Sequence, residues 1–249
     1  MKSKNNEISF FVIGARKCAT TWLYENLLLN PQVLLSADVK ESNYFSNNYD
    51  KGIEWYHSLF PSIWEGCIAG EIDTSLMYSS AAVDRIWQYN PDAKIIAMVR
   101  NPVEQFRSSY LHALRKGDLT CSASDAWEEN KVFQQEVTYS KFLEPWVDKF
   151  GKEQVKIIIY DELCDVPDSV LRKVSEFIGV PVKIEPDVLF SKVNVARSAR
   201  YALMTKVIVN LARSARRIGA NKLVNLLKRI VPSQLLYKEL NDEFSINAI

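Results

Sequence analysis

The segment GARKCATT, residues 14–21, places two basic side chains and two adjacent hydroxyls between an apolar run and a helical pattern. A loop that leads from a strand into a helix N-terminus binds anions, because its free N–H groups and the helix dipole point at one place. The Mg–ATP loop GxxxxGK[ST] has a lysine directly before its final hydroxyl, whereas here Thr20 precedes Thr21 and the lysine is Lys17. We therefore predict a cradle for a group less charged than phosphoryl, such as sulfuryl, held without a metal. The alternative is an ordinary strand–helix turn in which Arg16 and Lys17 are solvated.

A second anion-binding motif follows the apolar run at 94–99. Arg100 stands at the end of this run, and Ser108 comes two helical turns later, in a helix that Pro102 is suited to begin. A planar guanidinium and a hydroxyl can converge on one phosphate. The alternative is a surface arginine and an unrelated helical serine.

A third motif, Lys40-Glu41 in the segment KESNYF, pairs a lysine with a carboxylate. A neighbouring positive charge keeps a carboxylate ionised, so Glu41 is a candidate general base. The alternative is a surface ion pair. The only histidines are His57 and His112, and the four cysteines form no CxxC pair. A zinc site and a disulfide framework are therefore not expected.

Short apolar runs that alternate with helical patterns must position these motifs. We predict buried strands at 8–13, 94–99 and 155–160, and helices at 20–29, after 102 and at 168–178. This order predicts an α/β fold with a mostly parallel sheet covered by helices on both faces. Ligands of such sheets bind outside the carboxyl ends of the strands, which puts the first two motifs on one edge.

The composition is that of a globular protein, with 249 residues, 47% hydrophobic and 24% charged. It excludes collagen, coiled coil and extensive disorder as the main state. No apolar run approaches the ~20 residues that span a bilayer, and the N-terminus lacks the apolar region of a signal peptide. We therefore expect a cytoplasmic protein.

Charge is distributed unevenly along the chain. The first 187 residues carry 20 basic and 27 acidic side chains, a net of −7, whereas Val188 to Lys238 contains eleven basic residues and no acidic one. Two basic helices are expected there, at 200–217 and 220–231. They favour an anionic partner such as a nucleotide, an acidic glycan or a lipid surface, and the alternative is a solvated helical face.

Taken together in chain order, these motifs resemble the PAPS-dependent sulfotransferase superfamily, in which PAPS is 3′-phosphoadenosine 5′-phosphosulfate. FFVIGARKCATTWLYENL resembles the family's 5′-phosphosulfate loop, and IIAMVRNPVEQFRSSYLH resembles its 3′-phosphate motif. KESNYFSNNYDKGIEWYHSLFP resembles the corresponding stretch of the Golgi heparan sulfate sulfotransferases and their bacterial relatives. GEIDTSLMYS and YDELCDVPDSVLRKVSEFIGV also fit the family pattern. The resemblance covers residues 8 to about 200.

The resemblance implies a sulfotransferase domain with a P-loop-like fold at 1–200. The basic helical pattern that follows predicts an extension at 201–249, packed on the same domain. It implies that Lys17 stabilises the leaving group, that Glu41 deprotonates the acceptor hydroxyl, and that Lys40 and Asn43 lie on the acceptor side. The residues implied in binding the cofactor are Arg16, Lys17, Cys18, Ala19, Thr20 and Thr21 at its 5′ end, Arg100 and Ser108 at its 3′-phosphate, and Arg197 in a late loop.

Two departures from the family pattern affect these roles. Where the heparan-type enzymes often have a His and an Asp after the catalytic Glu, this chain has Asn43 and Ser46, which disfavours a heparan-like acceptor. The cytosolic enzymes of the superfamily use a catalytic His, so His57 is the second candidate base. His112, on the helix after Arg100, is expected to be structural.

The predicted activity is metal-free transfer of a sulfuryl group from PAPS to a hydroxyl of a glycan or small-molecule acceptor, with 3′,5′-adenosine bisphosphate as the product. The alternatives are a nucleotide-dependent kinase, disfavoured because the Walker lysine is absent, and a nucleotide-binding module without chemistry. We expect no nucleic-acid partner. Contact of the basic helices with an anionic membrane, and the oligomeric state, stay open.

Overall fold

The computed structural model describes residues 7–36, 39–62, 66–190, 197–199 and 237–239. The chain divides into two compact units. The first comprises Met1–Pro102 and Thr138–Val193, and the second comprises Val103–Val137 and Asn194–Ile249. The boundary predicted at residue 200 stays a prediction.

The first unit contains a five-stranded parallel sheet with the strand order β2-β3-β1-β4-β5. The strands are β1 (Ile8–Gly14), β2 (Val33–Leu35), β3 (Ile68–Ile72), β4 (Lys94–Val99) and β5 (Val155–Ile159). The central strands β1 and β4 are apolar almost throughout and buried, as expected for a parallel sheet covered on both faces.

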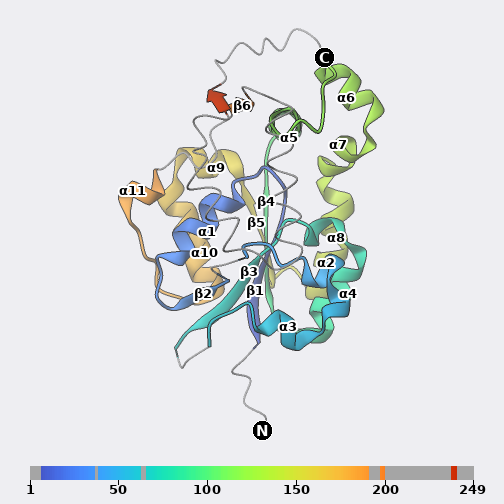
Figure 1. The fold of residues 1–249 in the computed structure, drawn as a ribbon. Coiled ribbons are helices and arrows are strands. Elements are labelled where there is room, and N and C mark those ends of the chain that lie inside the picture. The colour runs from blue at the N-terminus through green and yellow to red at the C-terminus, as the bar shows by residue number, and fades with distance from the viewer. Residues whose placement is uncertain (1–6, 37–38, 63–65, 191–196, 200–236, 240–249) are drawn as a thin grey trace. The chain divides into compact units, whose positions relative to one another are not determined.

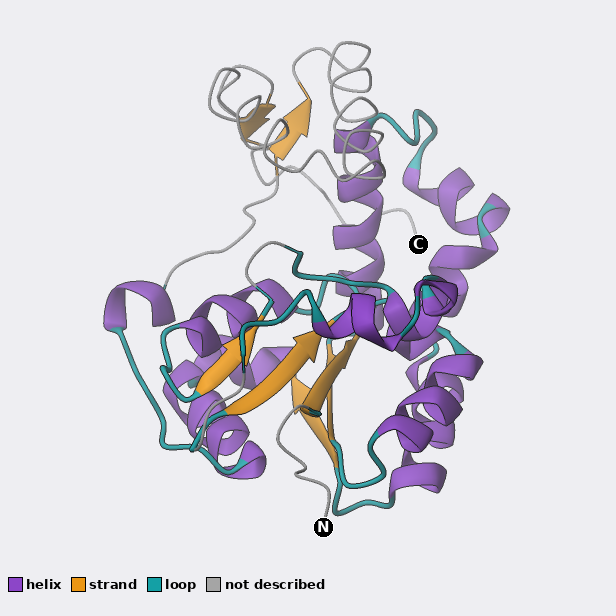
Figure 2. Cartoon of the chain, turned by 60° about the horizontal axis from the view of Figure 1, so that its bottom comes forward, coloured by secondary structure: helices purple, strands orange, loops and turns teal. Residues whose placement is uncertain are grey.

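Helices cover both faces of this sheet (Figure 1). On one face lie α1 (Thr20–Leu28), α9 (Tyr160–Asp165), α10 (Pro167–Ile178) and α11 (Pro186–Leu189). On the other lie α2 (Tyr44–Asn47), α4 (Ser80–Tyr89) and α8 (Tyr139–Phe150), with α3 (Ile53–His57) near the amino end of β1 and the short 3₁₀ helices η1 (Tyr49–Lys51) and η2 (Leu76–Tyr78). The view in Figure 2 shows the strands running in one direction between these helices. The predicted α/β architecture is thus confirmed.

Gly70 illustrates how closely β3 packs against β1. A Cβ atom at Gly70 would lie 2.0 Å from Cζ of Phe10, so only glycine leaves room for this buried ring. The close fit keeps β3 beside β1, and the carboxyl ends of both strands therefore open onto the same edge.

The three strands predicted from the sequence are present, and the predicted helices at 20–29 and 168–178 correspond to α1 and α10. Helix α10 begins with Pro167 and ends at Gly179, which has the left-handed conformation that glycine adopts readily. Strands β2 and β3 were not predicted.

The second unit, in its described part, contains α5 (Pro102–Lys116, of which Pro102 belongs to the first unit), α6 (Ala123–Glu129) and α7 (Lys131–Glu136). Its own small core is formed by Phe106, Tyr110, Ala126 and Phe133. A short antiparallel pair joins β6 (Arg197–Ala199) to β7 (Tyr237–Glu239). The basic helices expected at 200–217 and 220–231 lie outside the described residues. Within the described ranges, no helix is both long and apolar enough to cross a bilayer.

Candidate active site

The loop between β1 and α1 forms the predicted anion cradle. Lys17 and Ala19 have positive φ angles of 63° and 65°, and these left-handed residues turn the chain sharply before α1 begins at Thr20. The Ala19 carbonyl already accepts a helical hydrogen bond from the Leu23 N–H at 3.2 Å. The free N–H groups of the first helical turn are therefore presented next to the hydroxyls of Thr20 and Thr21.

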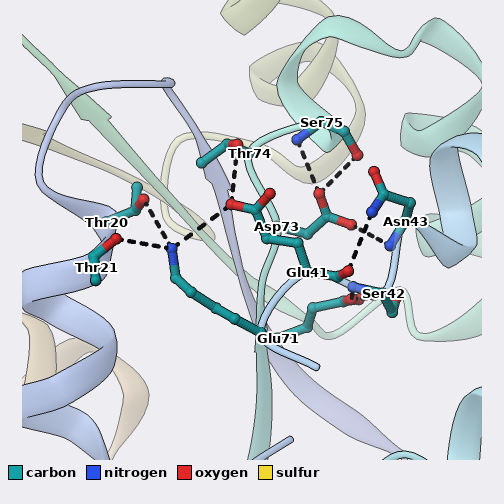
Figure 3. Close-up of polar contacts among 10 residues, drawn as sticks. Thr20, Thr21, Glu41, Ser42, Asn43, Glu71, Asp73, Thr74 and Ser75 are labelled. Atoms are coloured by element: carbon teal, nitrogen blue, oxygen red, sulfur yellow. Dashed lines mark hydrogen bonds and ion pairs between the residues drawn. The ribbon is translucent and has the colours of Figure 1, made fainter. Parts of the chain in front are cut away.

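The loop after β2 brings a second lysine to this cradle. The ammonium Nζ of Lys40 donates to Oγ1 of Thr20 at 3.4 Å and to Oγ1 of Thr21 at 3.3 Å (Figure 3). The same atom lies 3.6 Å from Oε1 of Glu41. Burial lowers the pKa of Lys40, and the charge of Glu41 partly opposes this shift. Lys40 thus links the cradle to the predicted base.

Glu41 lies between this lysine and the end of β3. Its Oε1 accepts a hydrogen bond from Oγ1 of Thr74 at 3.2 Å, and 37% of its side chain is exposed. A carboxylate that is held by two neighbours and still open to solvent is placed to accept a proton from an incoming hydroxyl.

Two buried carboxylates, Glu71 in β3 and Asp73 just after it, bind the two residues that follow Glu41 (Figure 3). Glu71, 2% exposed, accepts hydrogen bonds from both the N–H and the hydroxyl of Ser42, and from the Tyr56 hydroxyl at 2.7 Å. Asp73, fully buried, accepts from the N–H of Asn43 at 2.7 Å and from the N–H and hydroxyl of Ser75. Burial raises the pKa of Glu71 to about 8 and also raises the pKa of Asp73.

Neither Glu71 nor Asp73 was predicted from the sequence to have a role in the site. The available signal was the alternation Glu71-Ile72-Asp73, with two acids two positions apart at the end of a strand. Residues two positions apart on a strand share a face, so this spacing predicts that the side chains of Glu71 and Asp73 point to the same side.

Asn43, predicted to lie on the acceptor side, occupies a turn. It has a φ angle of 54°, its N–H is bound to Asp73, and its side-chain amide donates to the Glu41 carbonyl at 3.1 Å. These contacts make Asn43 part of the loop that presents Glu41.

Three of the predicted cofactor-binding residues contact tyrosine side chains, namely Arg16, Cys18 and Arg100. The Arg16 guanidinium lies over the Tyr78 ring, 5.4 Å from its centre, and the Arg100 guanidinium lies 4.2 Å from the centre of the Tyr160 ring. Cys18 is buried, and its Sγ is 3.8 Å from the Tyr139 hydroxyl. That hydroxyl also accepts a hydrogen bond from the Arg100 backbone N–H, so Tyr139 joins the loop after β1 to the loop after β4.

Two predicted site residues belong to the second unit, and one lies elsewhere in the first unit. Ser108, on α5, and Arg197, which begins strand β6 and not a loop, belong to the second unit, and their contacts with a nucleotide stay predictions. His57 was the second candidate base. Its Nε2 lies 2.9 Å from the Tyr89 hydroxyl, which also accepts from the N–H of Ile8, the first residue of β1. His57 therefore lies at the opposite end of β1 from the cradle.

The described part of the first unit thus combines an anion cradle, two lysines and a partly exposed carboxylate at one sheet edge. This arrangement can hold an anionic group and take a proton from a nucleophile beside it. In the described ranges, no group of three or more His, Cys, Asp and Glu side chains is arranged to hold a metal ion.

The chain is similar to known sulfotransferases. Residues 7–214 match the family model of the sulfotransferase domain. The chain is 31% identical over 178 residues to mouse heparan sulfate glucosamine 3-O-sulfotransferase 3A1, covering 68% of this chain and 45% of that protein. It is 30% identical over 223 residues to human heparan sulfate glucosamine 3-O-sulfotransferase 5, covering 83% and 63%. The chain thus spans about half the length of the curated relatives it matches.

The fold is also that of a solved bacterial protein. A sulfotransferase from Alicyclobacillus acidocaldarius superposes with a TM-score of 0.67 at 24% identity, and the match covers 88% of this chain and 96% of that one.

Proposed function

The chain belongs to the sulfotransferase domain family, and from that premise we propose that it transfers a sulfuryl group from PAPS to an acceptor hydroxyl. The observation that carries the proposal is the position of Lys40, whose ammonium contacts both cradle hydroxyls and the carboxylate of Glu41. A group held in the cradle therefore lies beside a candidate base.

The residues present fit the phosphosulfate of PAPS. Thr20, Thr21 and the first N–H groups of α1 are hydrogen-bond donors, and Lys40 adds a positive charge that burial leaves poorly solvated. Such a site favours an anion, because the anion replaces solvent around the ammonium. When bound, PAPS supplies the activated sulfuryl group and a phosphate as its leaving group.

The protein's own residues would divide the work as follows. Lys17, within the cradle loop, and Lys40 stabilise negative charge near the transferred group, where a preorganised donor contributes most in the transition state. Glu41 takes the proton from the acceptor hydroxyl. Arg16, Cys18 and Ala19 shape the loop, and Arg100 with Ser108 binds the 3′-phosphate, with Arg197 as a further phosphate contact.

The acceptor is proposed to be a carbohydrate or a small hydroxyl compound. The relatives named for heparan sulfate glucosamine favour a sugar hydroxyl. The positions at which this chain departs from the heparan-type pattern carry loop contacts instead: Asn43 binds Asp73, and the Ser46 hydroxyl lies 2.7 Å from that of Ser75. These residues therefore leave the class of sugar unspecified.

The decisive experiment incubates the protein in chelator with PAPS and separate pools of carbohydrate and small hydroxyl acceptors. Mass spectrometry should then find acceptors that have gained one sulfuryl group. A parallel reaction with Mg–ATP should yield no phosphorylated acceptor. Phosphorylated product would establish a kinase, and binding of the bisphosphate without transfer to any pool would establish a module without chemistry.

The basic segment from Val188 to Lys238 supports a further part of the proposal, namely that residues 201–249 form an extension that meets an anionic partner. The cytoplasmic location stays a prediction. Truncation after residue 200 tests whether this extension contributes to nucleotide affinity. Sedimentation with anionic vesicles at low and high salt tests the membrane contact.

A further inference from the structure

Glu71 and Asp73 hold two consecutive amide groups of the loop that carries Glu41. Glu71 accepts from the Ser42 N–H at 3.3 Å, and Asp73 accepts from the Asn43 N–H at 2.7 Å. Thr74, the next residue along the chain, donates to the Glu41 carboxylate itself. Three side chains within four positions thus bind three consecutive residues of the opposite loop.

The side chains of Glu71 and Asp73 take the place of the main-chain acceptors that a neighbouring strand would provide. The loop 40–43 is not part of the sheet, so its amides have no main-chain carbonyl of a ladder to bind. Asp73 accepts from the Asn43 N–H at 2.7 Å, the short distance typical of a charge-assisted hydrogen bond, whereas the Glu71 bond to the Ser42 N–H is longer, at 3.3 Å. The pair therefore fixes the loop at the end of β3 through side chains alone.

Holding two carboxylates in this interior has a cost, because burial disfavours their charged forms. Both are at most 2% exposed, and the pKa values of both are raised. A polar cluster at such depth is unfavourable unless its hydrogen bonds are made, and Glu71 and Asp73 accept six between them.

We propose that Glu71 and Asp73 are positioning residues for the transfer reaction, which act by fixing the backbone at Ser42 and Asn43 and thereby the place of Glu41 beside the cradle. This inference rests on the proposed function. A base that is displaced by about 1 Å can lose ~10²-fold in rate, so the effect should appear in turnover rather than in cofactor binding.

The first test is a double-mutant cycle between Asp73→Asn and Glu41→Gln. The Asn side chain keeps the shape of Asp73 but has one acceptor oxygen and one NH₂ donor. It therefore cannot accept all the hydrogen bonds that Asp73 accepts from Asn43 and Ser75. In the parent background kcat should fall ~10- to 100-fold, while KM for PAPS and the affinity for the bisphosphate change less than about threefold. In the Glu41→Gln background Asp73→Asn should have almost no further effect, because it acts through Glu41.

Two further variants distinguish a loss of positioning from a loss of the folded state. Ser42→Ala removes one hydroxyl donor to Glu71 and should lower kcat by a smaller factor while leaving the chain folded. Asp50→Asn, an exposed acid of η1, is the matched control and should leave kcat at the parental value. All rates are measured well below each variant's melting temperature.

The second test is independent of sulfuryl transfer. Hydrogen exchange in Asp73→Asn should become at least about tenfold faster at the Asn43 amide, with no change in the amides of β1. Unchanged exchange at Asn43 would overturn the anchoring. An equal loss of rate in both Glu41 backgrounds would overturn the positioning role and assign Asp73 to general stability. A parent chain that transfers no sulfuryl group to any acceptor would contradict the proposed function, and the positioning role with it, whereas the exchange result would still decide the anchoring.

Discussion

The ammonium of Lys40 lies 3.3 Å from the hydroxyl of Thr21, although Lys40 belongs to the loop after β2 and Thr21 to α1, which follows β1. The cradle sequence lacks a lysine next to its final hydroxyl, and Lys40 places one there from the loop after β2. The site therefore obtains its second positive charge through the tertiary fold.

Lys40→Met should separate catalysis from binding. Removing one charged donor from a preorganised site typically costs ~10²–10³ in kcat, and we expect a loss in that range with a smaller loss of affinity for the bisphosphate, which lacks the sulfuryl group. Steady-state kinetics and calorimetry measure the two quantities. Lys51→Met, which removes an exposed lysine that stacks on Trp55, is the control. Parental turnover in Lys40→Met would remove Lys40 from the mechanism.

Glu41→Gln should keep the fold and the bisphosphate affinity while the single-turnover rate falls ~10²–10⁴-fold, the usual contribution of a positioned base. His57→Gln should retain the parental rate within about twofold, because His57 bonds Tyr89 at the other end of β1. The reverse pattern, with a slow His57 variant and a fast Glu41 variant, would restore the histidine as the base.

Arg100→Ala should weaken binding of 3′,5′-adenosine bisphosphate by about 10- to 150-fold, since a charged hydrogen bond contributes ~1.5–3 kcal/mol. Calorimetry in chelator, with 5′-AMP as the comparison ligand, measures this loss. Arg172→Ala, an exposed arginine of α10, serves as the matched control. Equal affinity of the parent for the bisphosphate and for 5′-AMP would contradict recognition of the 3′-phosphate.

The stability of the chain should depend on pH through Glu71. Burial raises its pKa from an ordinary 4.5 to about 8, so the folded state binds a proton more tightly than the unfolded state does. The resulting stabilisation is complete below about 4.5 and is lost as the pH rises through about 8. Asp73, whose pKa is also raised, contributes in the same direction, and the Tyr56 hydroxyl faces Glu71 without titrating in this range.

Urea denaturation across that pH interval measures this dependence. In Glu71→Gln, the fall in the free energy of unfolding with rising pH should be much smaller than in the parent, because the amide does not titrate. Glu54→Gln, an exposed acid of α3, should behave like the parent. A parental slope in Glu71→Gln would assign the pH dependence to other groups.

The sequence alone predicted three of the five strands of the sheet, together with the polar loops that follow β1 and β4. The runs 8–13, 94–99 and 155–160 are apolar for four or more consecutive residues, and this local property was sufficient to identify β1, β4 and β5. The cradle loop and Arg100 could be placed at one edge because parallel strands end together. The resemblance to a known family added the roles of Lys17 and Glu41, which stay predictions.

The tertiary structure decided which of these residues meet. Strand β2 has only three residues and β3 contains a buried acid, so neither showed the apolar pattern of a strand, and the packing of both depends on β1. The contacts of Lys40 with Thr20 and Thr21, and of Asp73 with Asn43, join segments 19 to 30 residues apart. No local pattern encodes such contacts, because they exist only once the sheet order has set β3 next to β1. For the same reason His57, a plausible base by residue type, could be separated from the cradle only by the fold.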